Sequence, residues 1–205
     1  MDKYLDLKDK KLLAFDLYGT CINHDFDNAK ISRELKEILT TTPITLKELQ
    51  EKNKWNFEIT DELIENVRHD IEWTFLFPET LETLKYLKSK WYKIAVVSNL
   101  WKDYAEPLHR LIPEWIFDHE VLSFDVWARK PDPKIYEYLR EISKIDFKDM
   151  VFVWDTLKAD VIWPNNMWIT PIHVNRTEEW WIKEAEKLWI KFIQISTLAD
   201  LKDIL

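Results

Sequence analysis

Asp16 stands between an apolar run at 12–15 and a Leu-Tyr-Gly-Thr sequence at 17–20. A short apolar run of this kind is typical of a buried strand, and ligands of open α/β sheets bind at the carboxyl ends of such strands. An aspartate carboxylate at that point can act as a nucleophile and form a covalent intermediate. Because the segment alone also suits an ordinary turn, its interpretation depends on the segments that follow it in the chain.

Three later segments carry further reactive side chains. In the first, Ser98 and Asn99 follow the apolar run 94–97, and in the second, Lys130 lies in the Arg-Lys-Pro-Asp-Pro sequence at 129–133. In the third, Asp155 follows the apolar run 151–154, and Asp160 stands five positions later. In this order, the four segments resemble the four motifs of the haloacid dehalogenase superfamily of hydrolases. The resemblance extends from about residue 11 to the C-terminus.

This resemblance implies a role for each reactive side chain. Asp16 would attack phosphorus in line and hold the product as an aspartyl phosphate. Ser98 would donate a hydrogen bond to a transferring oxygen, and Lys130 would neutralise charge on the nucleophile and the phosphoryl group. Thr20 and Asn99 would contact the substrate. The expected activity is therefore hydrolysis of a small phosphorylated metabolite.

The acidic residues of the fourth motif suggest a magnesium site. Mg²⁺ prefers oxygen ligands and is commonly held by one or two carboxylates, water and substrate phosphate. Asp16, Asp155 and Asp160 would supply carboxylates, and the resemblance adds the backbone carbonyl of Tyr18 as a ligand. Asp160 has an alternative interpretation as an acid at a helix N-terminus, where it would interact favourably with the helix dipole.

Tyr18 departs from the pattern of the phosphatases in this superfamily. Those enzymes usually have a second Asp two residues after the nucleophile, which protonates the leaving group, and a phenol of ordinary pKa near 10 is a poorer acid at neutral pH. The L-2-haloacid dehalogenases have Tyr at this place and a second Tyr six residues after the motif lysine, as Lys130 and Tyr136 are spaced here. They lack the acid that this chain keeps as Asp155. Both activities stay open.

A catalytically silent protein of the same fold is a third interpretation. Trp154 precedes Asp155 where superfamily members usually have Gly. An indole beside Asp155 would occupy space that phosphate and metal need. The sequence therefore leaves a phosphatase, a dehalogenase and a binding protein as alternatives.

Short strands and helices alternate through most of the chain, which predicts βαβ units on a parallel sheet. The expected strands are 11–16, 93–98, 117–122, 150–154, 170–174 and 192–195, and the expected helices are 79–90, 103–111, 133–143, 158–167 and 178–188. The predicted fold is an α/β, three-layer, Rossmann-like parallel sheet. Its strand ends would bring the four motifs to one edge.

Residues 23–77 form an exception, because they contain no convincing strand. Helices are expected at 27–40, 45–54 and 60–75, with a capping box at 45–48 and Thr60 as a helix cap. This segment lies where superfamily members carry a helical cap. We therefore predict a core made of residues 1–22 and 78–205, with a small helical cap at 23–77 inserted after the first strand.

The chain contains twelve Trp and one Gly among its 205 residues, which is abnormal. Several of these Trp residues occupy places where Gly is usual, namely Trp91, Trp168 and Trp189 between a helix and a strand, and Trp127 and Trp154 beside the motifs. A helix commonly ends with a left-handed residue, usually Gly. We therefore predict a positive φ for at least two of Trp91, Trp168 and Trp189.

The overall composition narrows the possible partners. A formal charge of −8, with scattered Lys and Arg, argues against a nucleic-acid partner. No apolar run approaches the roughly 20 residues that cross a bilayer, and residues 1–4 lack the apolar stretch of a signal peptide. Cys21 is the only cysteine, so a reducing cytoplasm is expected. The oligomeric state cannot be predicted from these features.

Overall fold

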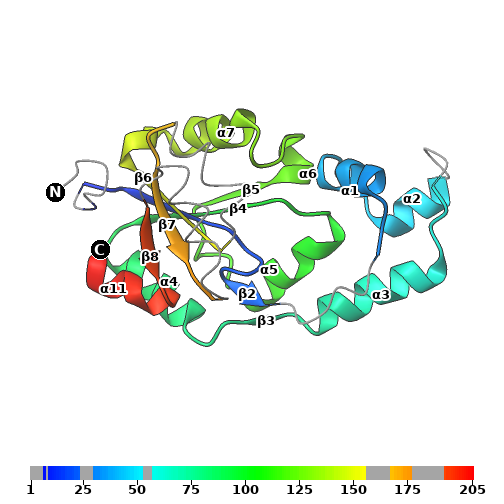
Figure 1. Ribbon diagram of the computed structural model, residues 1–205, viewed down its shortest axis with the longest axis horizontal. Helices are drawn as coiled ribbons and strands as arrows, with labels where there is room; N and C mark the ends of the chain where they lie inside the picture. The colour runs from blue at the N-terminus through cyan, green and yellow to red at the C-terminus, as the bar shows by residue number, and fades with distance from the viewer. Residues whose placement is uncertain (1–6, 8, 24–29, 53–56, 156–166, 177–191) are drawn as a thin grey trace.

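The computed structural model describes residues 7, 9–23, 30–52, 57–155, 167–176 and 192–205. Its centre is a sheet of six strands in the order β5-β4-β1-β6-β7-β8, and all neighbouring strands run parallel (Figure 1). The strands are β1 (Leu12–Phe15), β4 (Lys93–Ser98), β5 (His119–Leu122), β6 (Met150–Trp154), β7 (Thr170–Val174) and β8 (Ile193–Ile195). The predicted α/β fold and all six predicted strands are confirmed.

Helices cover both faces of the sheet and complete the three layers. One face carries α4 (Thr80–Ser89), α5 (Glu106–Leu111) and α11 (Leu201–Ile204), and the other carries α7 (Pro133–Ser143), as Figure 1 shows. A short helix, α6 (Ser123–Val126), follows β5, and 3-10 turns occupy Asp103–Ala105, Phe147–Asp149 and Leu198–Asp200. The expected helices at 158–167 and 178–188 lie almost wholly outside the described residues.

Alternation along the central strands explains why two apolar layers form. Successive side chains of a strand point to opposite faces of the sheet. On β6, Val151 and Val153 pack with α4 and α5, whereas Phe152 and Trp154 pack with α7. Because both faces are covered, the strands are apolar throughout, as expected for a parallel sheet.

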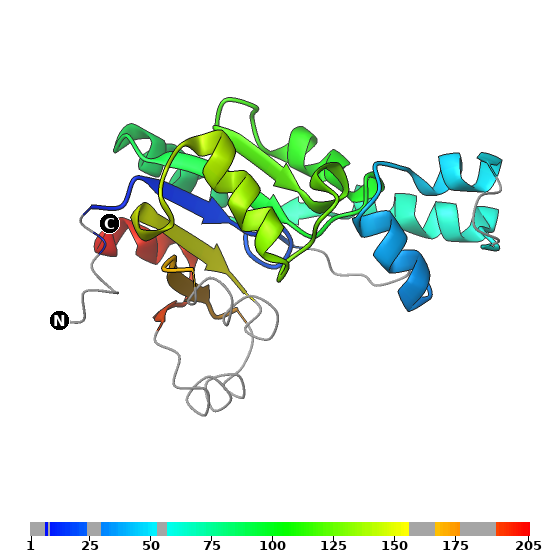
Figure 2. The same cartoon turned by 90° about the horizontal axis from the view of Figure 1, so that it is seen from above.

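A separate helical part extends from one side of the sheet (Figure 2). It consists of α1 (Arg33–Thr40), α2 (Leu46–Lys52) and α3 (Asp61–Glu72), which share a third apolar cluster. The predicted capping box is present, since Thr45 and Glu48 exchange hydrogen bonds of 2.8 and 3.1 Å. The boundaries of a cap at 23–77 remain a prediction.

Two short strands connect this helical part to the sheet. They are β2 (Ile22–Asn23) and β3 (Phe75–Leu76), which pair antiparallel. The expectation that 23–77 contains no strand was therefore wrong at both ends of the segment. Two-residue strands carry no periodic signal, and these form because the chain leaves and re-enters the core at adjacent points.

Trp residues adopt the left-handed conformation at three of the predicted glycine-like positions. Trp91, Trp127 and Trp168 have φ of 68°, 57° and 69°. Their side chains are 92%, 67% and 63% exposed. The prediction of a positive φ for at least two of Trp91, Trp168 and Trp189 is confirmed by the first two, whereas Trp189 lies outside the described residues.

Candidate active site

The Asp16 carboxylate lies at the end of β1 and is held by groups from two other segments. Its Oδ1 accepts hydrogen bonds from the Ser98 hydroxyl at the end of β4 and from the Leu17 backbone N–H, both at 2.8 Å. Its Oδ2 lies 2.7 Å from Nζ of Lys130. Lys130 is buried to 1% side-chain exposure, so this ion pair is largely shielded from water.

Asn99 fixes the backbone of Lys130. The Asn99 side-chain amide donates to the Lys130 carbonyl at 2.9 Å, and its oxygen accepts from the Lys130 N–H at 2.7 Å. The Lys130 side chain also passes over the Phe152 ring, with Nζ 5.4 Å from the ring centroid. Asn99 thus positions Lys130, and its predicted contact with substrate stays a prediction.

Gly19 allows Asp155 to lie against the loop that follows the nucleophile. Gly19 has φ +78°, and a Cβ added to it would stand 2.2 Å from Asp155 Oδ2. The Thr20 hydroxyl lies 3.5 Å from Asp155 Oδ1, and Thr20 is fully buried. The second carboxylate therefore rests on the Gly19-Thr20 backbone, close to the segment that begins at Asp16. The proposed substrate contact of Thr20 stays a prediction.

His173 supports Asp155 from the neighbouring strand. Its Nε2 donates to the Asp155 carbonyl at 2.8 Å. Burial of the ring lowers the pKa of His173 below its usual value, although the hydrogen bond to Asp155 opposes this shift. The neutral ring therefore acts as a backbone anchor at the end of β6.

The Tyr18 side chain contacts the 3-10 turn that follows β4. Its hydroxyl donates to the Tyr104 carbonyl at 3.1 Å, and the two rings meet edge to face at 5.9 Å. Burial raises the pKa of Tyr18 well above its usual value. The hydroxyl that occupies the place of a general acid is thus engaged in a contact between segments.

Trp154 and Tyr136 are both fully buried in the apolar cluster beneath α7. The Trp154 ring lies 5.0 Å from that of Phe152, and the Tyr136 ring lies 5.8 Å from the same ring. Among the described residues, the Trp154 indole N–H has no hydrogen-bond partner. The indole therefore packs with α7 and the apolar side of β6.

The oxygen groups near the Gly19 loop are of the kind that binds a hard cation. The Asp16 carboxylate precedes this loop and the Asp155 carboxylate lies against Gly19, while Tyr18, whose carbonyl was predicted as a ligand, lies within the loop. Hard cations such as Mg²⁺ take oxygen ligands of this kind. Within the described part of the chain, no group of three or more His, Cys, Asp or Glu side chains is arranged to hold a metal ion. Asp160, the third predicted acid, lies outside the described residues.

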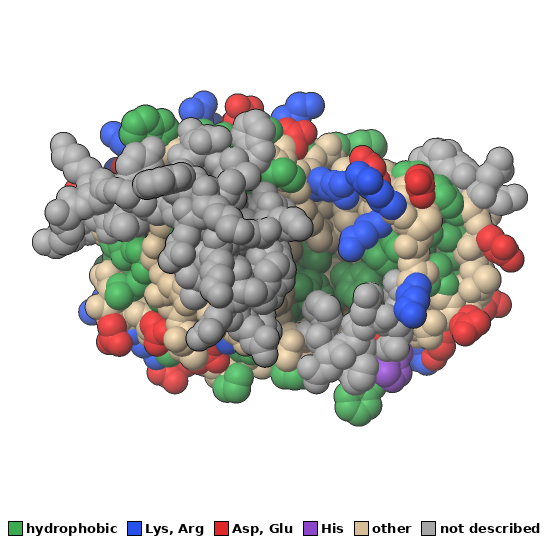
Figure 3. Space-filling model, viewed as in Figure 1, with side chains coloured by type: hydrophobic (Ala, Val, Ile, Leu, Met, Phe, Trp, Pro, Cys, Tyr) green, Lys and Arg blue, Asp and Glu red, His purple; other side chains and the backbone are tan. Residues whose placement is uncertain are grey.

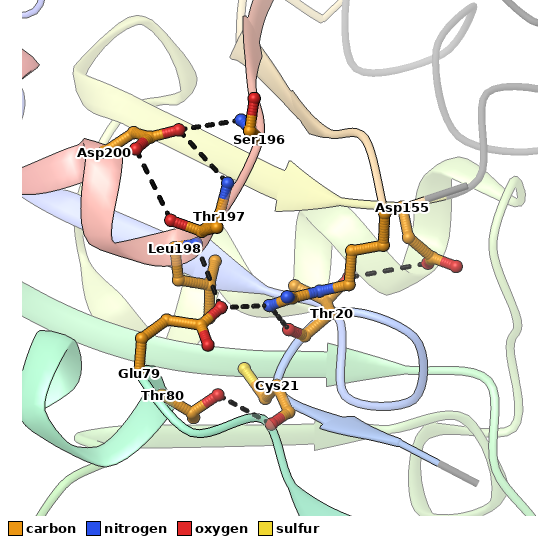
Figure 4. Close-up of polar contacts among 10 residues, drawn as sticks. Thr20, Cys21, Glu79, Thr80, Asp155, Ser196, Thr197, Leu198 and Asp200 are labelled. Carbon is orange, nitrogen blue, oxygen red and sulfur yellow. Dashed lines mark hydrogen bonds and ion pairs between the residues drawn. The ribbon is translucent and has the colours of Figure 1, made fainter. Parts of the chain in front are cut away.

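Arg176 and Glu79 adjoin the candidate site, and the sequence analysis identified neither of them. Arg176 Nη2 donates to the Thr20 carbonyl and to Glu79 Oε1, each at 2.8 Å (Figure 4). Arg176 stands two residues after β7, at the same edge of the sheet as Asp16. Its position after a buried strand was the signal that could have identified it.

The surface near this edge is hollowed and carries positive charge. In Figure 3, Lys and Arg side chains gather over the junction between α6 and α1, and hydrophobic side chains line the adjacent hollow. None of the helices in the described ranges combines the length and apolar character that spanning a bilayer requires.

Comparisons with known proteins agree with this architecture. The chain is 30% identical over 141 residues to a glyceraldehyde 3-phosphate phosphatase of Methanothermobacter thermautotrophicus, an alignment that covers 67% of this chain and 62% of that protein. The chain therefore spans about three fifths of the length of this curated relative. A second glyceraldehyde 3-phosphate phosphatase, from Methanopyrus kandleri, is 28% identical over 53% of this chain and 48% of its own length.

Solved structures share the fold at lower identity. An enzyme of Bacteroides thetaiotaomicron, crystallised with magnesium and inorganic phosphate, matches with a TM-score of 0.63 and 21% identity over 83% of this chain and 97% of its own. A dehalogenase matches with a TM-score of 0.69 and 19% identity over 97% and 98% of the two chains. The family model that describes a haloacid dehalogenase-like hydrolase matches residues 10–162. With its parallel sheet and four motif segments at one edge, this chain belongs to the haloacid dehalogenase-like hydrolase family.

Proposed function

We propose that this hydrolase is a Mg²⁺-dependent phosphatase that acts on a small phosphorylated metabolite through an aspartyl-phosphate intermediate. One observation carries the proposal. The Asp16 carboxylate is held by Ser98 and Lys130 at 2.8 and 2.7 Å, and a second carboxylate, Asp155, is kept beside the same loop. A phosphatase uses both acids, whereas the dehalogenases that have Tyr at position 18 lack the second.

The side chains around Asp16 suit a two-step displacement. In the first step, an Asp16 oxygen attacks phosphorus while the bond from phosphorus to the leaving oxygen breaks. The leaving oxygen takes a proton from solvent water. In the second step, water attacks the phosphorus while the bond from phosphorus to the Asp16 oxygen breaks, which releases inorganic phosphate, returns a proton to solvent and restores the carboxylate. Lys130 offsets negative charge near the nucleophile, and the Ser98 hydroxyl orients the carboxylate. The burial of Lys130 strengthens both effects, because water screens the charges less.

Asp16, Asp155, the Tyr18 carbonyl and Asp160 would hold the magnesium ion. When bound, it would neutralise charge on the phosphoryl oxygens. The family member crystallised with magnesium and inorganic phosphate supports this assignment, as does the all-oxygen donor set around Gly19. By holding the ion, Asp155 and Asp160 would fix where the phosphate lies relative to Asp16.

A small anionic substrate is supported by two observations. The curated relatives are named for the hydrolysis of glyceraldehyde 3-phosphate. The cationic side chains beside the hollow would attract an anion, although the whole chain has a formal charge of −8. We propose neither nucleic acid nor membrane as a partner, and we propose a cytoplasmic location, which the presence of a single cysteine favours.

Dehalogenation of a 2-haloacid through an aspartyl ester is the second candidate. The tyrosine at position 18 favours it, because halide leaves without a proton and the Tyr18 hydroxyl is occupied by the Tyr104 carbonyl. A silent binding protein was the third interpretation, based on Trp154. That indole packs beneath α7 against Phe152, which favours an active site at the Gly19 edge.

Replacement of Asp16 by Asn tests the covalent mechanism. We expect hydrolysis of small phosphoesters to fall by at least about 10³-fold, because an amide cannot form the phosphoenzyme. Phosphoester hydrolysis by the unmodified protein should disappear when EDTA removes divalent cations and return when Mg²⁺ is added. Phosphate release from a panel of small phosphoesters and chloride release from 2-chloropropionate, each with and without Mg²⁺, are the measurements.

Asp149→Asn provides the matched control. Asp149 pairs with Lys11 at the opposite end of the strands and should retain full activity. Chloride release without phosphate release would favour the dehalogenase. Undiminished phosphate release by Asp16→Asn would exclude the aspartyl-phosphate mechanism.

A further inference from the structure

Arg176 links the loop after the nucleophile to a distant part of the fold. One nitrogen, Nη2, donates to both the Thr20 carbonyl and Glu79 Oε1 at 2.8 Å (Figure 4). The side chain is 13% exposed, and its guanidinium carbon lies over the Phe77 ring, 3.5 Å from the ring centroid. A planar guanidinium stacked in this way has little freedom to change its hydrogen bonds.

Glu79 fixes Arg176 from the other side. Its Oε1 also accepts from the Leu198 N–H at 3.4 Å, so the carboxylate joins α4 to the turn after β8. Burial acts to raise the pKa of Glu79, but hydrogen bonds and the Arg176 charge outweigh it and hold the pKa below its usual value. Glu79 is therefore charged at neutral pH, as its pairing with Arg176 requires.

The Thr20 carbonyl is a sensitive point of the site. The next carbonyl, that of Cys21, accepts from the Thr80 hydroxyl at 2.8 Å and from the Phe77 N–H at 3.2 Å. Two successive carbonyls are thus held by groups outside the loop. On the other side of this backbone, Gly19 and the Thr20 hydroxyl face the Asp155 carboxylate. A shift of Thr20 would therefore move the surface on which Asp155 rests.

We infer that Arg176, oriented by Glu79 and Phe77, is a positioning residue that holds the Gly19-Thr20 backbone so that Asp16 and Asp155 keep their relative placement. The expected effect on turnover rests on the proposed function. The expected effect on the loop backbone does not, because it is measured on the protein without substrate. A displacement of about 1 Å in a catalytic geometry can cost about 10²-fold in rate, so a distant hydrogen bond of this kind affects turnover.

Arg176→Gln tests the inference in two ways. Hydrogen exchange of the Gly19, Cys21 and Ile22 amides, which are bonded within the loop, should accelerate in the free protein, while exchange in β4 stays slow. On the best phosphoester of the panel, kcat should fall about 10–100-fold with KM changed less than about twofold. Arg176→Lys should recover part of the slow amide exchange and part of kcat, because lysine keeps the positive charge but lacks the planar guanidinium.

Lys88→Gln is the matched control, since Lys88 and Asp118 form an ion pair of the same 2.8 Å length and similar burial, away from the loop. This variant should lose a comparable amount of thermal stability without faster loop exchange or lower kcat. Unchanged exchange at the three loop amides in Arg176→Gln would overturn the inference. A drop in kcat in Arg176→Gln that is no larger than the drop in Lys88→Gln would also overturn it. If Asp16→Asn keeps its activity, the proposed function fails, and the exchange measurement still decides the role of Arg176.

Discussion

The single glycine of this chain, Gly19, occupies a position where a side chain has no room. Gly19 combines a φ of +78° with a Cα that faces the Asp155 carboxylate, so both backbone conformation and space exclude a Cβ. Elsewhere the chain tolerates non-glycine residues at positive φ, because their side chains point to solvent. At residue scale, the close approach of Asp155 therefore distinguishes Gly19 from the Trp positions.

Gly19→Ala should damage stability and activity together. The added methyl would meet Asp155 Oδ2 at 2.2 Å and the residue would be held in the left-handed region, with a combined cost of about 2–5 kcal/mol. Urea unfolding and Mg²⁺-dependent phosphate release measure the two effects. Lys144→Ala is the control, because Lys144 already has φ 58° and its replacement should change little. An alanine variant equal to the parent in both measurements would contradict this account of the loop.

At the scale of elements, helix ends determine which Trp residues are strained. Trp91 and Trp168 each stand two residues before a strand, β4 and β7 respectively, and both have positive φ. Trp73 also follows a helix but has φ −90°. Trp73 is the C-cap residue of α3, and its φ equals that of Lys90, the C-cap residue of α4, whereas Trp91 lies one residue beyond the cap, where a left-handed residue is common.

Trp91→Gly should stabilise the protein. The left-handed conformation costs a non-glycine residue about 1–2 kcal/mol, and the replacement removes this cost. Glycine in turn destabilises the folded state by about 0.5–1 kcal/mol, because it loses more conformational entropy on folding. The indole is 92% exposed, so little packing is lost, and a net gain of about 0.5–1 kcal/mol is expected. Denaturant unfolding measures it. Trp73→Gly, at a negative φ, should give no gain. Equal effects at both positions would show that left-handed strain is not the cause.

For the whole molecule, the segment after β4 joins the sheet to the helical part. Trp101 is 7% exposed within the cluster of α1, α2 and α3, and Tyr104 donates its hydroxyl to Asp70 of α3 at 3.1 Å. Asp103 Oδ2 accepts from the Leu46 N–H at the start of α2, at 3.1 Å. Because Ser98 and Asn99 begin the same segment, the site and the helical part share one connection.

Asp103 should make stability depend on pH. Burial raises the pKa of Asp103 above its ordinary 3.8, and the nearby Glu48 carboxylate adds to this, while the Leu46 N–H and Lys102 oppose it. The folded state therefore holds this proton to higher pH than the unfolded state, so the contribution of Asp103 to stability falls as pH rises from 3.8 through the raised pKa.

Asp103→Asn keeps an acceptor for Leu46 and should be more stable than the parent at pH 7. The difference should shrink as pH is lowered toward 4, as urea unfolding across pH 4–7 would measure. Asp118→Asn is a control of opposite sign, because Lys88 and Lys93 hold the pKa of Asp118 below its usual value despite partial burial. A stability difference for Asp103→Asn that grows toward low pH would refute the assignment.

The sequence alone determined the sheet and the order of its motifs. Apolar runs of four to six residues ending in Asp16, Ser98 and Asp155 specify strands and their reactive tips, because strand pattern and strand end are local properties. The left-handed conformation of Trp91 was likewise predictable, since a helix that ends shortly before a strand commonly closes with a left-handed residue.

Only the tertiary structure decided the contacts between segments distant in the sequence. Nothing local indicates that Arg176 reaches the Thr20 carbonyl across 156 positions, that Trp101 enters the helical cluster, or that Trp154 turns toward α7. The pairing of β2 with β3 could not be predicted either, because a strand of two residues is too short for a periodic sequence pattern. These features depend on which side of the sheet each segment crosses and how closely the segments then approach, and chain topology fixes both.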